Sequence, residues 1–272
     1  MRLVAVFIWP LMLLLALPAA WADARLSVLV DVLRLDEAAQ ILSQEGIAFS
    51  DELDRDMLDG QGGAAWRTQV TNIYDAQRMT ETLREALATG LQGEALEQAI
   101  TFYASDLGSD IVRFENTARV IIADPEAEAA AREQFVARMA RDDPRIEVIG
   151  RLISSGDMVT RNVTNEMNAQ FQFLRGLSDG DALDMSEAEM LRDASEDVDA
   201  KTEETRLWLN SYLLMAYAPL SDEQLETYVQ FSQSTAGKAL NRALFTGFAN
   251  AYEEIFYALG RAVALNMRAR DL

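Results

Sequence analysis

Hydrophobic residues recur along this chain at the spacing of amphipathic helices, and no segment alternates as a half-buried strand would. Leu225, Tyr228, Val229 and Ser232, for example, follow the i, i+3, i+4, i+7 pattern of one helix face. The pattern predicts helices over about 26–45, 50–58, 64–88, 92–104, 106–123, 125–141, 146–155, 158–174, 186–217, 221–233 and from about 235 onward. We therefore expect an all-α fold, a multi-helix bundle.

Glycine and proline mark the predicted ends of these helices. Gly46 and Gly176 each follow a hydrophobic stretch and predict a stop there. Asp124-Pro125 and Asp143-Pro144 have the form of an N-cap followed by proline in the first helical position. Residues 176–186 form the most loop-like stretch after the N-terminal segment.

One pattern, F-x-x-S-x-x-G-x-x-(I/L), occurs twice. Residues 90–111 and 219–240 align without a gap and are identical at seven of 22 positions, where average usage would give roughly one or two. The copies share a phenylalanine, a serine and a glycine: Phe102, Ser105 and Gly108 in the first, and Phe231, Ser234 and Gly237 in the second. The repeat predicts a bundle built from two pseudo-repeated helical halves.

The repeated serine and glycine predict a structural corner between two helices. Each serine is placed to end one helix and cap the next, and each glycine would then lie at N3, where a missing side chain lets the preceding helix cross closely. Each phenylalanine would wedge into the corner. The alternative is an anion bound at the helix start, which Lys238 favours in the second copy, whereas Ser109 and Asp110 count against it in the first.

The helical halves have a predicted boundary at Asp143-Pro144. We assign 23–143 to the first helical half and 144–272 to the second. Such lengths suit small domains, but the pattern leaves open whether the halves share one hydrophobic core. It also leaves the oligomeric state open.

Residues 1–22 have the form of a secretory signal peptide. Arg2 precedes an apolar stretch from Leu3 to Leu17, and Ala20-Trp21-Ala22 is an A-x-A cleavage site; Ala22-Asp23-Ala24 is a second acceptable site. An uncleaved anchor is the alternative, but the apolar run is shorter than the roughly 20 residues that a spanning helix needs. The segment predicts export to a bacterial periplasm, with no transmembrane segment in the mature chain.

Composition excludes several function classes. Lys and Arg number 24 and Asp and Glu 44, so the formal net charge is −20, which argues against nucleic-acid binding. The chain has no cysteine and no histidine. Disulfides, thiolate nucleophiles, histidine-based metal sites and Ser-His-Asp triads are therefore impossible.

The remaining candidate sites are weak. Glu253 and Glu254 beside aromatic residues are the one place for a carboxylate-based hydrolase, but adjacent residues diverge by about 100° on a helix. Asp179, Asp181 and Asp184 invite a calcium interpretation, yet their spacing differs from that of an EF-hand loop. We predict no catalytic residue, no cofactor and no metal site.

The second copy resembles a known bacterial family. Leu220-Ser221-Asp222-Glu223-Gln224-Leu225, followed by Phe231 to Leu240, is similar to the pattern L-(S/T)-x-x-(E/Q)-L…F-Y-x-S-P-x-G-x-K-(L/F) of domain of unknown function 2059. The resemblance is clearest over 219–260 and weaker near 90–122. Thr235 and Asp106 stand where the family usually has proline, and Ser232 replaces the tyrosine. The resemblance implies an exported all-helical protein and no particular activity.

These observations favour an exported, non-catalytic helical protein that binds a protein partner of unknown identity or is associated with the envelope. The first alternative is a carrier of an apolar small molecule or an unfolded chain, in a cleft between the halves lined by Phe and Met. The aromatic residues of the last helix fit either core packing or a contact surface: Phe245, Phe248, Tyr252, Phe256 and Tyr257.

Overall fold

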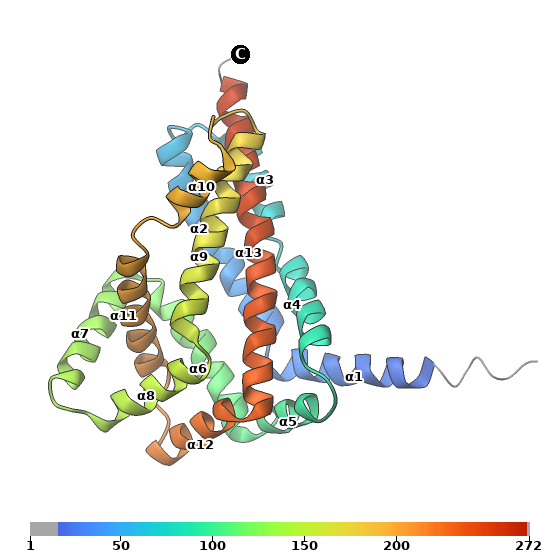
Figure 1. The fold of residues 1–272 in the computed structure, drawn as a ribbon, viewed down its shortest axis with the longest axis vertical. Helices are drawn as coiled ribbons and strands as arrows, with labels where there is room; N and C mark the ends of the chain where they lie inside the picture. The colour runs from blue at the N-terminus through green and yellow to red at the C-terminus, as the bar shows by residue number, and fades with distance from the viewer. Residues whose placement is uncertain (1–15, 271–272) are drawn as a thin grey trace, which may run out of the picture.

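The computed structural model describes residues 16–270, and this part of the chain contains helices and no strand (Figure 1), which confirms the predicted all-α class. Residues 1–15 of the predicted signal peptide lie outside the described residues. No helix between residues 16 and 270 is both long and apolar enough to span a bilayer. The helices are α1 (Ala16–Val32), α2 (Leu35–Met57), α3 (Gly63–Ile73), α4 (Ala76–Gly90), α5 (Gly93–Tyr103), α6 (Asp106–Ile122), α7 (Pro125–Met139), α8 (Pro144–Ser155), α9 (Met158–Asp179), α10 (Glu187–Ala194), α11 (Val198–Ala216), α12 (Asp222–Gln233) and α13 (Thr235–Arg270).

Three stretches predicted as single helices are each divided in two. The stretch 26–45 breaks between α1 and α2, where Arg34 has a left-handed backbone (φ 47°). The stretch 64–88 breaks between α3 and α4, where the Asp75 carboxylate caps α4 by accepting hydrogen bonds from the backbone N–H groups of Gln77 and Arg78. The stretch 186–217 breaks between α10 and α11, where Asp197 has a left-handed backbone (φ 56°). Aspartate serves the last two of these breaks because its short polar side chain caps helices and tolerates the left-handed conformation.

Two glycines predicted to end helices lie inside them. Helix α2 continues through Gly46, where a Cβ atom would lie 2.0 Å from the Tyr74 ring. Helix α9 continues through Gly176, where a Cβ atom would lie 2.3 Å from the backbone oxygen of Tyr257 in α13. Both glycines are therefore required by close approach of a neighbour and not by helix termination.

Two hydrophobic cores hold the helices together. The first core joins α1 to α5 with α13, and Leu29, Trp66 and Leu259 are among its fully buried members. The second core joins α6, α7, α8, α11 and α12, and Leu152 and Leu225 lie at its centre. Because each core buries its own apolar surface, the two parts of the molecule can meet along a less apolar boundary.

The chain crosses between these cores more than once. The first core contains Trp66 and Leu259, and the second contains Ile111 and Leu225, so both cores draw residues from both sides of the predicted boundary at 143/144. Helices α9 and α13 make the most extensive helix–helix contact of the described chain and run side by side through the middle of the molecule (Figure 1). The division into two halves stays a prediction.

Candidate functional site

The repeated motif forms two helix corners with the same local geometry. Ser105 caps α6 by accepting a hydrogen bond from the Gly108 N–H at 3.1 Å, and Ser234 accepts one from the Gly237 N–H at 3.0 Å. A Cβ atom on either glycine would lie 2.2 Å from the backbone oxygen of the phenylalanine of its own corner. Glycine is therefore the residue that lets each incoming helix end so close to the next one.

The two corners pack against each other. The rings of Phe102 and Phe231 are stacked, with centroids 4.0 Å apart and planes inclined by 5°, and the edge of Tyr103 meets the Phe231 ring at 5.7 Å. At the first corner the chain passes from α5 in the first core to α6 in the second, and at the other it returns from α12 to α13. The six motif residues thus pack together at the point where the chain passes from one core to the other.

The surroundings of Lys238 give little support to the interpretation that an anion binds at the second corner. This residue lines an open hollow of about 670 Å³ that also contains Glu147 and Arg151. The Arg151 guanidinium is bound to the Glu226 carboxylate, with Nη1 3.0 Å from Oε1. Beside Lys238, an anion would therefore meet one cation that is already paired and one carboxylate.

The acidic candidates of the sequence do not come together. Glu253 accepts a hydrogen bond from the Asn168 side chain at 3.1 Å, whereas Glu254 pairs with Arg78 at 2.8 Å, so the two carboxylates point to different helices. Asp179 accepts a hydrogen bond from the Tyr257 hydroxyl at 2.9 Å. In the described part of the chain, no group of three or more acidic side chains is placed to hold a metal ion.

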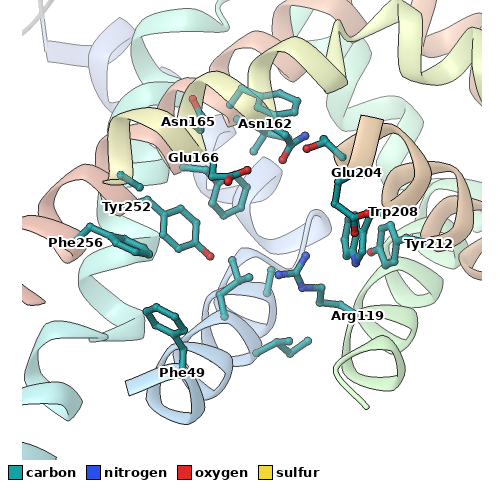
Figure 2. A pocket seen from close by; sticks show the side chains of 18 of the residues that line it. Phe49, Arg119, Asn162, Asn165, Glu166, Glu204, Trp208, Tyr212, Tyr252 and Phe256 are labelled. Atoms are coloured by element: carbon teal, nitrogen blue, oxygen red, sulfur yellow. The ribbon is translucent and has the colours of Figure 1, made fainter. Parts of the chain in front are cut away.

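A cavity of about 1020 Å³ lies between the two cores. Helices α2 and α13 from the first core form one wall, helices α6, α7 and α11 from the second core form the opposite wall, and α9 lies between them. Figure 2 shows Phe49, Tyr252 and Phe256 on one side of this space and Arg119, Trp208 and Tyr212 on the other.

The first wall is apolar. Its aromatic and aliphatic side chains line the cavity and are half-buried, or in one case exposed: Phe49, Leu244, Phe245, Phe248, Tyr252 and Phe256. The α13 members recur at spacings of three and four residues, which places them on one helix face. This face was predicted as core or contact surface. Tyr257, grouped with them in the sequence, is turned toward Asp179.

The second wall is polar, and Arg119 of α6 is its central cation. Its guanidinium makes two hydrogen bonds to the Glu45 carboxylate of α2, at 2.7 Å from Nε and 2.6 Å from Nη2, and lies 5.3 Å from the centre of the Trp208 ring. Burial lowers the pKa of Arg119, but the hydrogen bonds and charge of Glu45 outweigh it and hold that pKa above its ordinary value. The pair therefore ties one core to the other beside the cavity.

A second cation, Arg132 of α7, is held between two carboxylates. Its Nε donates to Glu128 at 2.9 Å and its Nη2 pairs with Glu204 of α11. The hydrogen bond from Arg132 lowers the pKa of Glu204, so this carboxylate is ionised at neutral pH. The three side chains leave one negative charge in excess at this end of the wall.

Glu115 is a partly buried acid of the polar wall. The Tyr217 hydroxyl donates to its carboxylate at 2.5 Å, the Tyr228 hydroxyl lies 3.3 Å from the same oxygen, and the Tyr212 hydroxyl donates to its backbone oxygen. Burial raises the pKa of Glu115, and the hydrogen bonds from the tyrosines oppose this only in part. Glu115 thus links α6 to α11 and α12.

The hydrophobic pattern of the last helix indicated the apolar wall, but no pattern in the sequence indicated the polar one. Phenylalanine lines the cavity as the carrier hypothesis expected, but methionine does not, which corrects that part of the expectation. The residues of the polar wall have the pattern of an ordinary charged helix surface. Arg119 and Glu45 are 74 positions apart, so only the fold brings them together.

Comparisons with known proteins found no relative of this chain. No family model, no curated protein and no solved structure matches the chain. The resemblance of residues 219–260 to domain of unknown function 2059 therefore stays a prediction.

Proposed function

We propose that this chain is a non-catalytic binding protein whose cavity holds one small molecule with an apolar body and a polar end. This is the alternative that the sequence raised beside protein binding. The observation that carries it is the division of the cavity into an apolar wall, with Phe245, Phe248 and Phe256, and a polar wall, with Arg119 and Glu204. Two unlike walls fit a ligand that is itself two-sided.

The size of the cavity supports a small molecule rather than a polypeptide segment. Its volume of about 1020 Å³ is close to the upper end of the roughly 300–1,000 Å³ that ligand pockets occupy. Each methylene group transferred from water to the apolar wall would contribute about 0.8 kcal/mol to binding. A chain of eight to ten carbons would thus supply several kcal/mol before any polar contact is counted.

The compartment is part of the same proposal. Residues 1–22 have the charge, apolar stretch and cleavage site of an export signal, so we propose that the binding protein acts in the periplasm. Cell fractionation of the tagged full chain checks this. Recovery of a shortened chain in the periplasmic fraction is expected, and recovery of the uncut chain in the cytoplasm would contradict it.

Titration with the neutral dye N-phenyl-1-naphthylamine, whose fluorescence rises in apolar surroundings, tests the binding function. The mature chain is expected to bind the dye saturably at one site. Ala38 of α2 lines the cavity, so Ala38→Trp should reduce the affinity at least tenfold. Ala48 of the same helix is exposed and outside the cavity lining, so Ala48→Trp should leave the affinity unchanged. Equal dye binding by both variants would contradict the proposal.

A further inference from the structure

The charges around the cavity indicate which polar group the ligand carries. Four carboxylates and two guanidinium groups line the cavity, from Glu115, Glu128, Glu166, Glu204, Arg119 and Arg132. Glu45, which binds Arg119 from α2, adds a fifth carboxylate at the edge. The surroundings of a bound molecule are therefore negative in sum, even when Glu115 is counted as neutral.

Neither cation of the lining is available to an anion. Arg119 presents two of its nitrogen atoms to one carboxylate, at 2.7 and 2.6 Å, which is the bidentate geometry of the strongest carboxylate–guanidinium pairs. Arg132 is held by Glu128 on its own helix and by Glu204 on α11. A ligand carboxylate or phosphate would have to displace a resident carboxylate to reach either guanidinium.

One carboxylate of the lining is unpaired. Glu166 of α9 is exposed and makes no hydrogen bond or ion pair with any residue that the structure describes. Figure 2 shows it at the cavity, between Tyr252 and the Asn165 and Asn162 side chains of its own helix. A positive group on a ligand would find here a carboxylate that does not need to be released from another cation.

The aromatic rings of the cavity suit a cation as well. The ring face of an aromatic side chain attracts a positive group within about 6 Å. Two lining rings already face a guanidinium in this way, Trp208 with Arg119 at 5.3 Å and Phe245 with Arg161 at 5.8 Å. The net charge of −20 adds a long-range field that concentrates cations, and not anions, near the surface.

We infer that the ligand of this cavity is a cationic amphiphile, an ammonium or guanidinium group on an apolar body. The inference rests on the proposed function and narrows it. The apolar body lies against the rings of α2 and α13, and the cation lies toward Glu166.

Three ten-carbon compounds separate this inference from the function on which it rests. Decylamine, decanol and decanoate share one apolar chain and differ in charge at pH 7. Each is titrated calorimetrically, the two charged compounds below their micellar concentrations and decanol below its solubility limit. The expected order of affinity is decylammonium, then decanol, then decanoate, with at least a tenfold difference between the first and the last. Because decanol is uncharged, its binding tests only the apolar part of the cavity and therefore the proposed function. If none of the three compounds binds, the proposed function itself is contradicted.

Matched variants locate the effect. Glu166→Gln should weaken decylammonium about three- to tenfold and leave decanol unchanged, whereas Glu133→Gln, an exposed change of equal charge outside the lining, should alter neither. Ala38→Trp should remove decylammonium binding, which excludes adsorption to the acidic surface. Decanoate or decanol binding as tightly as decylammonium, or decylammonium binding unaffected by Ala38→Trp, would overturn the inference.

Discussion

The helix corners and the cavity differ in how tightly their side chains are packed. At the corners the Phe102 and Phe231 rings stack at 4.0 Å, and neither Gly108 nor Gly237 has room for a Cβ atom. In the cavity, rings of similar size remain half-buried against about 1020 Å³ of open volume. The repeated motif thus stabilises the fold, while the wall residues leave part of their apolar surface facing the cavity. Substitutions in the two regions should accordingly separate stability from binding.

The largest expected effect is at the corner. Gly237→Leu would place side-chain atoms against the Phe231 backbone oxygen, 2.2 Å from the position of Cβ, and should lower the free energy of unfolding by about 3 kcal/mol or more. Urea unfolding measures it. Gly150 of α8 has nothing within 4 Å of its Cβ position, so Gly150→Ala should raise stability by about 0.5–1 kcal/mol. Wild-type stability of Gly237→Leu would refute the close-packing account.

Next in size is a core-versus-cavity contrast between two phenylalanines. Phe135 is 8% exposed in the second core, whereas Phe49 is 39% exposed at the cavity. Phe135→Ser should cost about 3–5 kcal/mol or prevent folding, and Phe49→Ser should cost less than about 1 kcal/mol while weakening binding of the neutral dye. Thermal and urea unfolding, followed by dye titration, check both. An equal loss of stability in the two variants would mean that Phe49 is an ordinary core residue.

The polar wall should make the free energy of unfolding depend on pH. Because burial raises the folded-state pKa of Glu115 above its ordinary value of 4.5, the folded chain retains a proton that the unfolded chain releases. The stability from this group is therefore complete below about pH 4.5 and is lost as pH rises through the folded pKa, at about 1.4 kcal/mol for each unit of pKa displacement. The surrounding hydroxyls of Tyr212, Tyr217 and Tyr228 stay neutral there, since burial raises the pKa of each.

Glu115→Gln removes this titration and keeps an acceptor for the Tyr217 hydroxyl. The variant should gain stability relative to the wild type as pH increases from 4.5 to 8, measured by urea unfolding at each pH. Glu133→Gln, exposed on α7, serves as the control and should run parallel to the wild type. Parallel curves for Glu115→Gln as well would show that Glu115 titrates normally.

The smallest effect concerns the contact between the two corners. A double-mutant cycle of Phe102→Leu and Phe231→Leu should give a coupling energy of about 0.5–1.5 kcal/mol, as stacked aromatic pairs do. The ring of Phe102 contacts those of Tyr103, Tyr228 and Phe231, and Phe135 is not among these partners. The corresponding cycle with Phe135→Leu should therefore give coupling near zero. Coupling near zero for Phe102 and Phe231 would mean that the corners fold independently of each other.

Local patterns in the sequence were sufficient to predict the helical class, most of the helices and the caps at Ser105 and Ser234, because these depend on neighbouring residues. Ser105 and Ser234 are three positions before the glycines whose N–H groups they bind. Gly46 and Gly176 misled the prediction of helix ends, since their reason for being glycine is the Tyr74 ring and the α13 backbone, both distant in sequence. Local patterns could not predict the polar wall for the same reason, because Arg119 and Glu45 meet only after folding.

Trp208 provides the most direct measurement of the central claim that this cavity binds a small amphiphile. After removal of residues 1–22, the chain contains two tryptophans, Trp66 in the first core and Trp208 in the cavity wall. In a Trp66→Phe chain, all tryptophan emission comes from the cavity. Titration with decanol should shift this emission saturably, at one ligand per chain and with no change in helix content. Emission that stays constant, or that changes without saturation, would contradict the account.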